Sequence, residues 1–409
     1  MIRLEMRKVS KAVQVCLIVY SALFLNFFLV GSITPLVPQL AKDHGLSDYE
    51  RSIILSAKSF AHMTASPIVA VLSYRISTQI IFSFGVFCIC GAFAGIAFAS
   101  TVVGFVAARS VQGIGVASIM VAGMSILVMA VPKEKRGKYT SFAYSALGHS
   151  TLISPLLSGL MYDRLGQMWT FLIPGIATFF AAIISVIVLS RLDTTYDQPV
   201  SISIVKIKGS VLSILTYPLS YISFIGIMSA GVSFGCFEST VPAILLHQLN
   251  SVIKTNLMWS IGPLMFTILA PILGYLIDKF GPIYVFISGL FFYAIFYPLF
   301  STIAVNIAGL GAIVALAFAC EAILEVSVYP IMAAVVDARQ PAATLTIAYA
   351  LNEVFIQCGF AIGDILGDAI HAWRGLLAMG AIMGGWNGVL AIVFLLLIRT
   401  KWFSQTPIP

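Results

Sequence analysis

The feature that most constrains this chain is a succession of apolar runs, each long enough to cross a lipid bilayer. A helix needs about 20 apolar residues to span the hydrocarbon core. Twelve such runs are predicted, at 12–36, 51–73, 79–99, 102–131, 137–161, 167–191, 219–246, 253–277, 281–301, 304–335, 342–368 and 371–398. The chain is therefore predicted to be an all-α membrane protein with twelve transmembrane helices.

Composition agrees with a lipid environment. Hydrophobic residues make up 60% of the 409 residues and charged residues only 10%, against about 25% charged in a soluble domain. These values exclude a soluble enzyme, a disordered chain and a nucleic-acid binder, and they make the lipid bilayer the expected partner. No Ser/His/Asp set, metal cluster or phosphate loop is found in the spans, so we expect no enzymatic activity and no cofactor.

The chain reads as two copies of a six-helix unit. A polar connection at 192–218 separates an N-terminal half, 1–191, from a C-terminal half, 219–409. The segment that begins at Ser66 is similar to the segment that begins at Ala270, and Pro38 and Pro242 stand at the same offset of 204 residues. A pseudo-symmetric six-plus-six arrangement is typical of transporters, whose halves rock about a site at the membrane midplane.

Basic residues predict the orientation. If the N-terminus is cytoplasmic, sixteen of the 23 Lys and Arg residues fall on the cytoplasmic side and five on the other side. Positive charge marks the cytoplasmic loops of membrane proteins. Both termini and the central connection are therefore predicted to be cytoplasmic, and the net charge of +7 is a topology signal.

Two motifs resemble signatures of the major facilitator superfamily. Arg109-Ser-Val-Gln112-Gly113-Ile-Gly115 opens span four, and Gly274-Tyr-Leu-Ile-Asp278-Lys279-Phe-Gly281 follows span eight. The resemblance implies the twelve-helix fold of that superfamily and a role for these residues in conformational switching. Asp278 is expected to meet the N-terminus of span eleven or a nearby arginine when the cytoplasmic side is closed.

Ionisable residues inside the spans are the candidates for function, because they are costly in a membrane. Lys58 is the one lysine near the middle of a span, in span two, whereas the second half holds the four glutamates Glu238, Glu321, Glu325 and Glu353. Asp364 and Asp368 lie toward the outer end of span eleven. An excess of acids predicts a cavity for a cation, for protons, or for both.

Carboxylates suit an exchange of protons for amines. A buried carboxyl takes up a proton more readily than one in water, and the ionised form can pair with an ammonium group. Glu321 and Glu325 are four residues apart and share a helix face. Lys58 is expected to pair with Glu353, either as part of the transport mechanism or as a structural tie only, and His62 could join a proton relay.

A closer resemblance joins the chain to the vesicular amine transporters. It rests on Ala57-Lys58, on Glu238-x-x-x-Pro242, on Glu325 with Tyr329-Pro-Ile-Met332, and on Asn352-Glu353-Val354. It implies that Glu325, with Glu321, Lys58 and Glu353, serves proton coupling. It also implies a substrate cavity at Asn26, Glu238, Glu325, Tyr329 and Phe360, in which aromatic rings face an ammonium group.

The first span departs from that family, because Asn26 stands where the family has an aspartate. An amide can accept a hydrogen bond but cannot neutralise an ammonium group, so acidity has moved from span one to span ten. We therefore expect either weaker binding of simple amines or a preference for a substrate with two charges, such as a polyamine.

The function expected from the sequence is a proton-coupled antiporter that moves an organic cation across an intracellular vesicle membrane, acts as a monomer and draws its energy from a proton gradient. Two alternatives stay open. One is a drug or metabolite exporter of the same superfamily at a surface membrane. The other is a non-transporting relative that serves as a sensor or scaffold.

Overall fold

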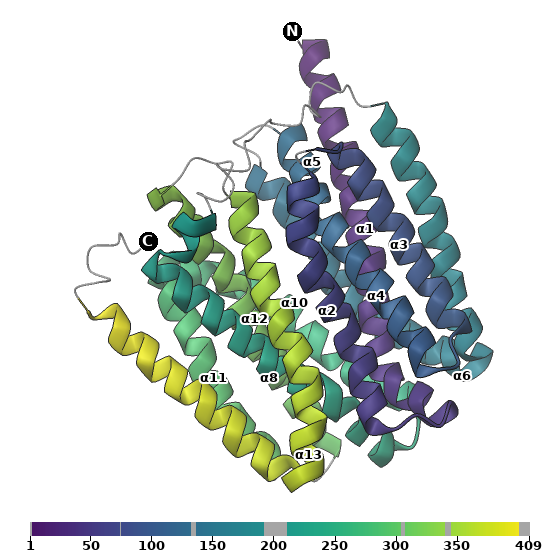
Figure 1. Ribbon diagram of the computed structural model, residues 1–409, viewed down its shortest axis with the longest axis vertical. Coiled ribbons are helices and arrows are strands. Elements are labelled where there is room, and N and C mark those ends of the chain that lie inside the picture. The colour runs from purple at the N-terminus through teal and green to yellow at the C-terminus, as the bar shows by residue number, and fades with distance from the viewer. Residues whose placement is uncertain are drawn as a thin grey trace. The chain divides into compact units, whose positions relative to one another are not determined.

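The computed structural model describes residues 2–73, 75–131, 136–191, 211–303, 307–339 and 345–400. All the elements in these ranges are helices (Figure 1). They are α1 (Ile2–Asp43), α2 (Asp48–Leu72), α3 (Thr78–Phe98), α4 (Val102–Ser118), the π-helix η1 (Ile119–Gly123), α5 (Met124–Ala130), α6 (Arg136–Ser190), α8 (Pro218–Leu249), α9 (Val252–Trp259), α10 (Ile261–Phe280), α11 (Pro282–Ile303), α12 (Ile307–Arg339) and α13 (Leu345–Ile398).

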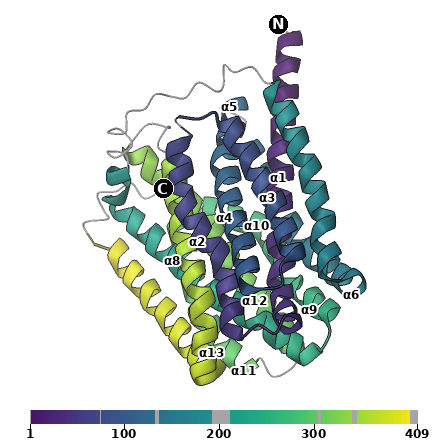
Figure 2. The same cartoon turned by 45° about the vertical axis from the view of Figure 1, so that its right-hand side comes forward.

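Within the described ranges, ten helical stretches are long and apolar enough to cross a membrane. Two of them, in α6 and α13, are far longer than the others because each consists of two helices. Gly166 (φ 72°) and Gly375 (φ 71°) break these helices with a left-handed backbone, and the two legs of α13 are visible in Figures 1 and 2. Ten stretches with two internal breaks amount to twelve crossings, which confirms the predicted all-α membrane fold.

The contacts between residues divide the chain into two compact units, and each is described by itself. Unit 1 comprises Met1–Ile33 and Ala57–Ile202, and unit 2 comprises Thr34–Ser56 and Ser203–Pro409. Helices α1 and α2 each begin in one unit and end in the other. The predicted halves stay a prediction, because 192–210 of the connection between them lie outside the described residues.

Unit 1 is built on α3, which packs against α4 and α6. Phe82 and Phe93 of α3 are fully buried, as are Phe105 of α4 and Phe171 of α6. Helix α4 lies so close to α2 that a Cβ on Gly113 would come within 2.8 Å of the backbone nitrogen of His62. The backbone contact at Gly113 therefore depends on glycine.

Unit 2 is organised around a seam between α8 and α13. Gly231 and Gly235 of α8 face Gly359 and Gly363 of α13. A Cβ on Gly235 would lie 2.9 Å from the backbone nitrogen of Asp364, and a Cβ on Gly359 would lie 2.9 Å from the backbone nitrogen of Val232. Small residues let helix backbones approach closely in a membrane, so α8 and α13 form one tightly packed pair.

Candidate functional site

The acids predicted to carry function lie in unit 2, on three helices. Glu321, Glu325 and Tyr329 follow one another at intervals of four residues and so lie along one face of α12. Glu321 is buried, whereas Glu325 and Tyr329 are half-buried. The rest of α12 is mainly apolar, so these three side chains form a polar face on it.

Glu321 is held by a tyrosine that the sequence did not single out. Its Oε2 accepts a hydrogen bond of 2.9 Å from the hydroxyl of Tyr293, a fully buried residue of α11. Its Oε1 has no hydrogen-bond partner among the described residues. One turn further along α11, the buried Tyr297 donates its hydroxyl proton to the backbone oxygen of Ser233 on α8.

Glu238 on α8 is half-buried and accepts a hydrogen bond of 2.6 Å from the hydroxyl of Thr34. Glu238 and Glu321 both lie in unit 2. The structure thus places one acid predicted to bind substrate, on α8, and one predicted to carry protons, on α12, in the same unit.

Tyr329, another predicted residue, contacts Glu353 of α13. The hydroxyl of Tyr329 donates a hydrogen bond of 2.8 Å to its Oε1. Phe360, one of the rings expected near the ammonium group, packs edge-on against Phe234 with their centroids 5.9 Å apart. Its part in a cation cage stays a prediction.

Lys58 and Asn26 lie in unit 1. Lys58 is half-buried, and Asn26 is only 1% exposed with neither amide atom hydrogen-bonded within the described ranges. His62, one turn after Lys58, is also buried. The expected pairing of Lys58 with Glu353, and the meeting of Asn26 with Glu238, join residues of different units and stay predictions.

The span-four motif forms a compact polar contact. The buried guanidinium of Arg109 donates a hydrogen bond of 2.6 Å to the side-chain oxygen of Gln112. Gly115 packs against α3, where a Cβ would lie 2.9 Å from the backbone oxygen of Gly85. Directly after this motif the helix widens into η1, and π-turns of this kind are frequent at functional sites.

The hinge-loop motif ends α10. Gly281 has a φ of 83°, and its N–H donates to the backbone oxygen of Ile277 at 2.9 Å. Asp278 and Lys279 are exposed, and Gly274 has open space around its Cα. The beginning of the predicted span eleven, 342–344, lies outside the described residues, so the expected contact of Asp278 there stays a prediction.

Sequence reasoning missed a cluster around Arg51 in α2 and Asp368 in α13. The Nη2 of Arg51 lies 2.9 Å from Oδ1 and 2.8 Å from Oδ2 of Asp368, and its Nη1 lies 2.9 Å from Oδ1 of Asp48. Ser52 donates its hydroxyl proton to the same carboxylate of Asp368. The predicted topology offered a signal, because it places the start of span two and the end of span eleven on the same side of the membrane.

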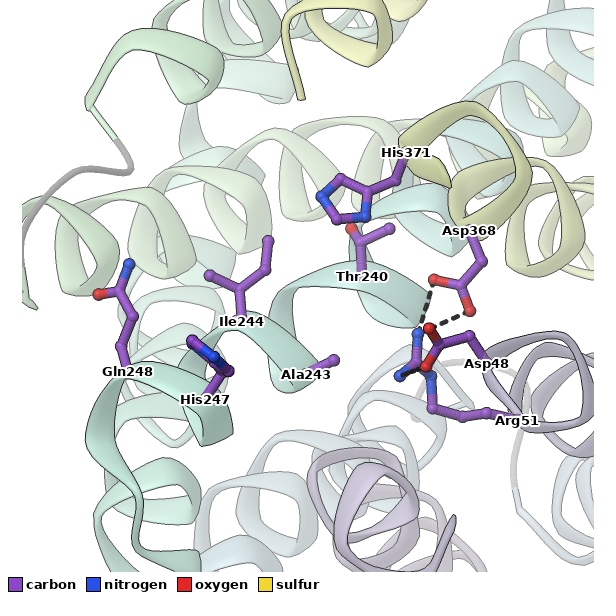
Figure 3. Close-up of a pocket in the computed structure, with 9 residues that line it drawn as sticks. All are labelled: Asp48, Arg51, Thr240, Ala243, Ile244, His247, Gln248, Asp368 and His371. Atoms are coloured by element: carbon purple, nitrogen blue, oxygen red, sulfur yellow. Dashed lines mark hydrogen bonds and ion pairs between the residues drawn. The ribbon is translucent and has the colours of Figure 1, made fainter. Parts of the chain in front are cut away.

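A pocket of about 290 Å³ adjoins this cluster. In Figure 3, Arg51, Asp48 and Asp368 gather on one side of it, and His247 and Gln248 lie on the other. The remaining lining residues are Thr240, Ala243, Ile244 and His371.

An all-helical, multi-pass membrane protein with carboxylates gathered inside its spans has the form of a membrane transporter. The sequence profile of the Major Facilitator Superfamily matches residues 19–222 and, a second time, 223–405. The chain belongs to this superfamily, as a divergent member related to the vesicular amine transporters.

The relatives found by sequence support that placement. A synaptic vesicular amine transporter of Mus musculus is 26% identical over 375 residues, which cover 89% of this chain and 68% of that protein. A chromaffin granule amine transporter of Rattus norvegicus is 26% identical over 349 residues, which cover 83% of this chain and 64% of that protein. The chain therefore spans about two thirds of the length of these relatives.

Solved structures agree on the fold. The crystal structure of the nucleoside transporter NupG has a TM-score of 0.73 at 12% identity and covers 95% of this chain and 100% of its own. An auto-inhibited peptide transporter of the POT family has a TM-score of 0.72 at 14% identity and covers 95% and 97%. At these identities the similarity concerns the fold alone.

Proposed function

We propose that this protein is a proton-coupled antiporter that exchanges protons for a small organic cation. The observation that carries the proposal is the state of the acids in unit 2. Glu238 accepts its hydrogen bond from the hydroxyl of Thr34, and Glu321 accepts its hydrogen bond from the hydroxyl of Tyr293. Carboxylates held by neutral donors remain able to take a proton or an ammonium group.

Competition between these two ligands gives the exchange. A carboxyl that binds a proton on one side of the membrane loses its attraction for an ammonium group and releases it there. On the other side the proton leaves, and the carboxylate binds the next cation. Alternating access of the site to the two sides turns this competition into transport.

In this proposal Glu325, supported by Glu321, Lys58 and Glu353, carries the proton. Glu238 and Asn26 bind the ammonium group, with the rings of Tyr329 and Phe360 beside it. The motifs at Arg109 and Asp278 take part in the conformational switch. The proton gradient supplies the energy, so the cycle needs no cofactor.

The proposed location is an intracellular vesicle membrane, with both termini in the cytoplasm and the protein acting as a monomer. The relatives at 26% identity include transporters named for synaptic vesicles and for chromaffin granules. The distribution of Lys and Arg supports the orientation.

The test is amine uptake by proteoliposomes with and without an imposed pH gradient. Glu325→Gln should lower gradient-driven uptake by at least about tenfold, because the amide cannot bind and release a proton, and should leave amine exchange measurable. Asp163→Asn, at an exposed acid of unit 1, is the matched control and should leave uptake unchanged. Wild-type accumulation by Glu325→Gln would exclude Glu325 as the coupling residue.

A further inference from the structure

The corner between the first two spans belongs to the second unit. Residues Thr34–Ser56, which end α1 and begin α2, are part of unit 2, although the rest of both helices lies in unit 1. Two sets of polar contacts attach this corner segment to unit 2. One is the hydrogen bond from Thr34 to Glu238, and the other joins Arg51 and Ser52 to Asp368.

The contact at Asp368 is buried and is made by the corner segment alone. Arg51 is 7% exposed and Asp368 is 8% exposed. In the part of the chain that is described, Arg51 and Ser52 are the donors to the carboxylate of Asp368. If the corner moved away, Asp368 would lose its counter-charge, and a buried charge without a partner is strongly unfavourable.

The pocket beside this ion pair gives it access to water. His247 and Gln248 on its far wall are exposed, and Figure 3 shows Arg51 and Asp368 along the opposite wall. Water can reach the two charges from this pocket when they separate, which lowers the cost of separation. The contact is therefore strong when closed and still able to open.

The contact at Glu238 involves the proposed substrate-binding acid. The hydroxyl of Thr34 lies 2.6 Å from Oε1 of Glu238, the length of a charge-assisted O–H···O bond, and an ammonium group would bind the same oxygen at a similar distance. Thr34 and a bound amine thus compete for the same carboxylate.

The glycine seam makes the two contacts depend on one another. Glu238 lies on α8 and Asp368 on α13, and these helices touch through Gly231, Gly235 and Gly359. Because the pair α8 and α13 is packed backbone to backbone, it carries both acids together. A corner segment that moves as one body therefore leaves both acids together.

We propose that the corner segment is a gate over Glu238, in which Arg51 and Asp368 hold the corner closed while Thr34 occupies the carboxylate until a cation displaces it. Arg51, Asp368 and Thr34 are positioning residues in this scheme. This proposal rests on the proposed function in one respect, namely that Glu238 binds an amine. The ion pair can be tested without any transported substrate.

The first experiment measures opening of the pocket. Thr240→Cys places a thiol at a buried position of the pocket wall, and its rate of reaction with a maleimide reports access in the purified protein, with the parent protein as the background. Arg51→Gln and Asp368→Asn should each raise that rate at least about fivefold, the lower end of conformational coupling energies. Arg374→Gln, at an exposed arginine of α13, is the matched control.

Rescue separates charge pairing from general loosening. Arg51→Lys keeps the charge and should label slowly, and the exchange of charges in Arg51→Asp with Asp368→Arg should return the rate toward that of the parent. The gate is refuted if the single variants label like the parent, or if Arg51→Lys labels as fast as Arg51→Gln.

The second experiment measures equilibrium binding of radiolabelled tyramine. Thr34→Val removes the competing hydroxyl and should tighten binding about threefold to tenfold, since a neutral hydrogen bond contributes about 0.5–1.5 kcal/mol. Unchanged or weaker binding would exclude Thr34 as a competitor. If tyramine and spermidine both fail to bind the parent protein, the proposed function fails, and the labelling rates still decide whether Arg51 and Asp368 form a gate.

Discussion

The two halves of the sequence divide the charges between them. Spans one to six contain no acid and hold the cations Arg51, Lys58, Arg109, Lys138 and Arg191. Spans seven to twelve hold six buried or half-buried acids, and their cations Lys254 and Arg374 are exposed. The acids are Glu238, Glu321, Glu325, Glu353, Asp364 and Asp368. Among the described residues, the buried and half-buried charged groups within the spans are therefore cations in the first half and acids in the second.

Two of these acids have partners from the first half of the sequence, whereas Glu321 and Glu353 accept hydrogen bonds from tyrosines of the second half. Asp368 is paired with Arg51, and Glu238 accepts from Thr34. A counter-charge on a different segment can leave, whereas a counter-charge on the same helix cannot. Separating the charges between the halves makes their pairing reversible, as a transport cycle requires.

The largest effect is expected at Lys58 and at Glu353, its predicted partner in the second half. Leaving one charge of a buried pair without its partner costs about 3–5 kcal/mol. Lys58→Ala and Glu353→Ala should each abolish uptake and lower the melting temperature, and the double variant should recover part of both losses. Strictly additive losses in the double-mutant cycle would show that the two residues do not meet.

The next effect concerns the seam that carries the acids. Gly359→Val forces a side chain into the space where the backbone of α8 lies 2.9 Å away, and overpacking of this kind typically costs about 1–3 kcal/mol. The melting temperature of the purified protein should fall accordingly. Gly385→Ala, where nothing lies within 4 Å of the added Cβ, should melt at the same temperature as the parent. An equal fall in melting temperature for both variants would show that the contact between α8 and α13 does not depend on Gly359.

A smaller effect is expected at the tyrosine that holds Glu321. Tyr293→Phe removes the 2.9 Å hydrogen bond and leaves both carboxylate oxygens without a donor, at a cost of about 1–3 kcal/mol. Thermal unfolding in detergent should show the loss. Tyr284→Phe removes an exposed hydroxyl from the same helix and should not; a stable Tyr293→Phe would argue that Glu321 is neutral or hydrated.

The smallest effect is expected when an acid is introduced into the spans of the first half. Asn26→Asp should raise the affinity for a monoamine such as tyramine by about tenfold, a charged hydrogen bond adding roughly 1–2 kcal/mol over a neutral one. It should leave the affinity for spermidine nearly unchanged if the second charge is bound at Glu321. Competition binding measures both affinities. A gain in affinity limited to spermidine would show that position 26 binds the second charge of a polyamine and not the ammonium group of a monoamine.

Length and polarity were enough to predict the fold. Uninterrupted apolar runs must be helical in lipid, because every backbone group has to be paired within its own segment. The same reasoning found Glu321 and Glu353, since an acid inside an apolar run is conspicuous. It missed Tyr293 and Thr34, because a tyrosine or a threonine in a membrane helix is ordinary until its partner is known.

Arg51 was missed for a different reason. It lies at the edge of a span, where a basic residue is expected to face water, and its contact with Asp368 spans 317 residues of sequence. No local pattern connects such distant positions. The repeat did contain a signal for Thr34, which stands 204 residues before Glu238, the same offset as Pro38 and Pro242.

The corners at Gly166 and Gly375 bear on how the protein is made. Each joins two apolar helices through a single left-handed residue, and Asp163, Arg164 and Arg374 beside them are exposed. Such corners give the insertion machinery no polar loop on which to pause between one helix and the next. We expect spans five and six, and likewise eleven and twelve, to leave the ribosome and enter the bilayer as preformed helical hairpins.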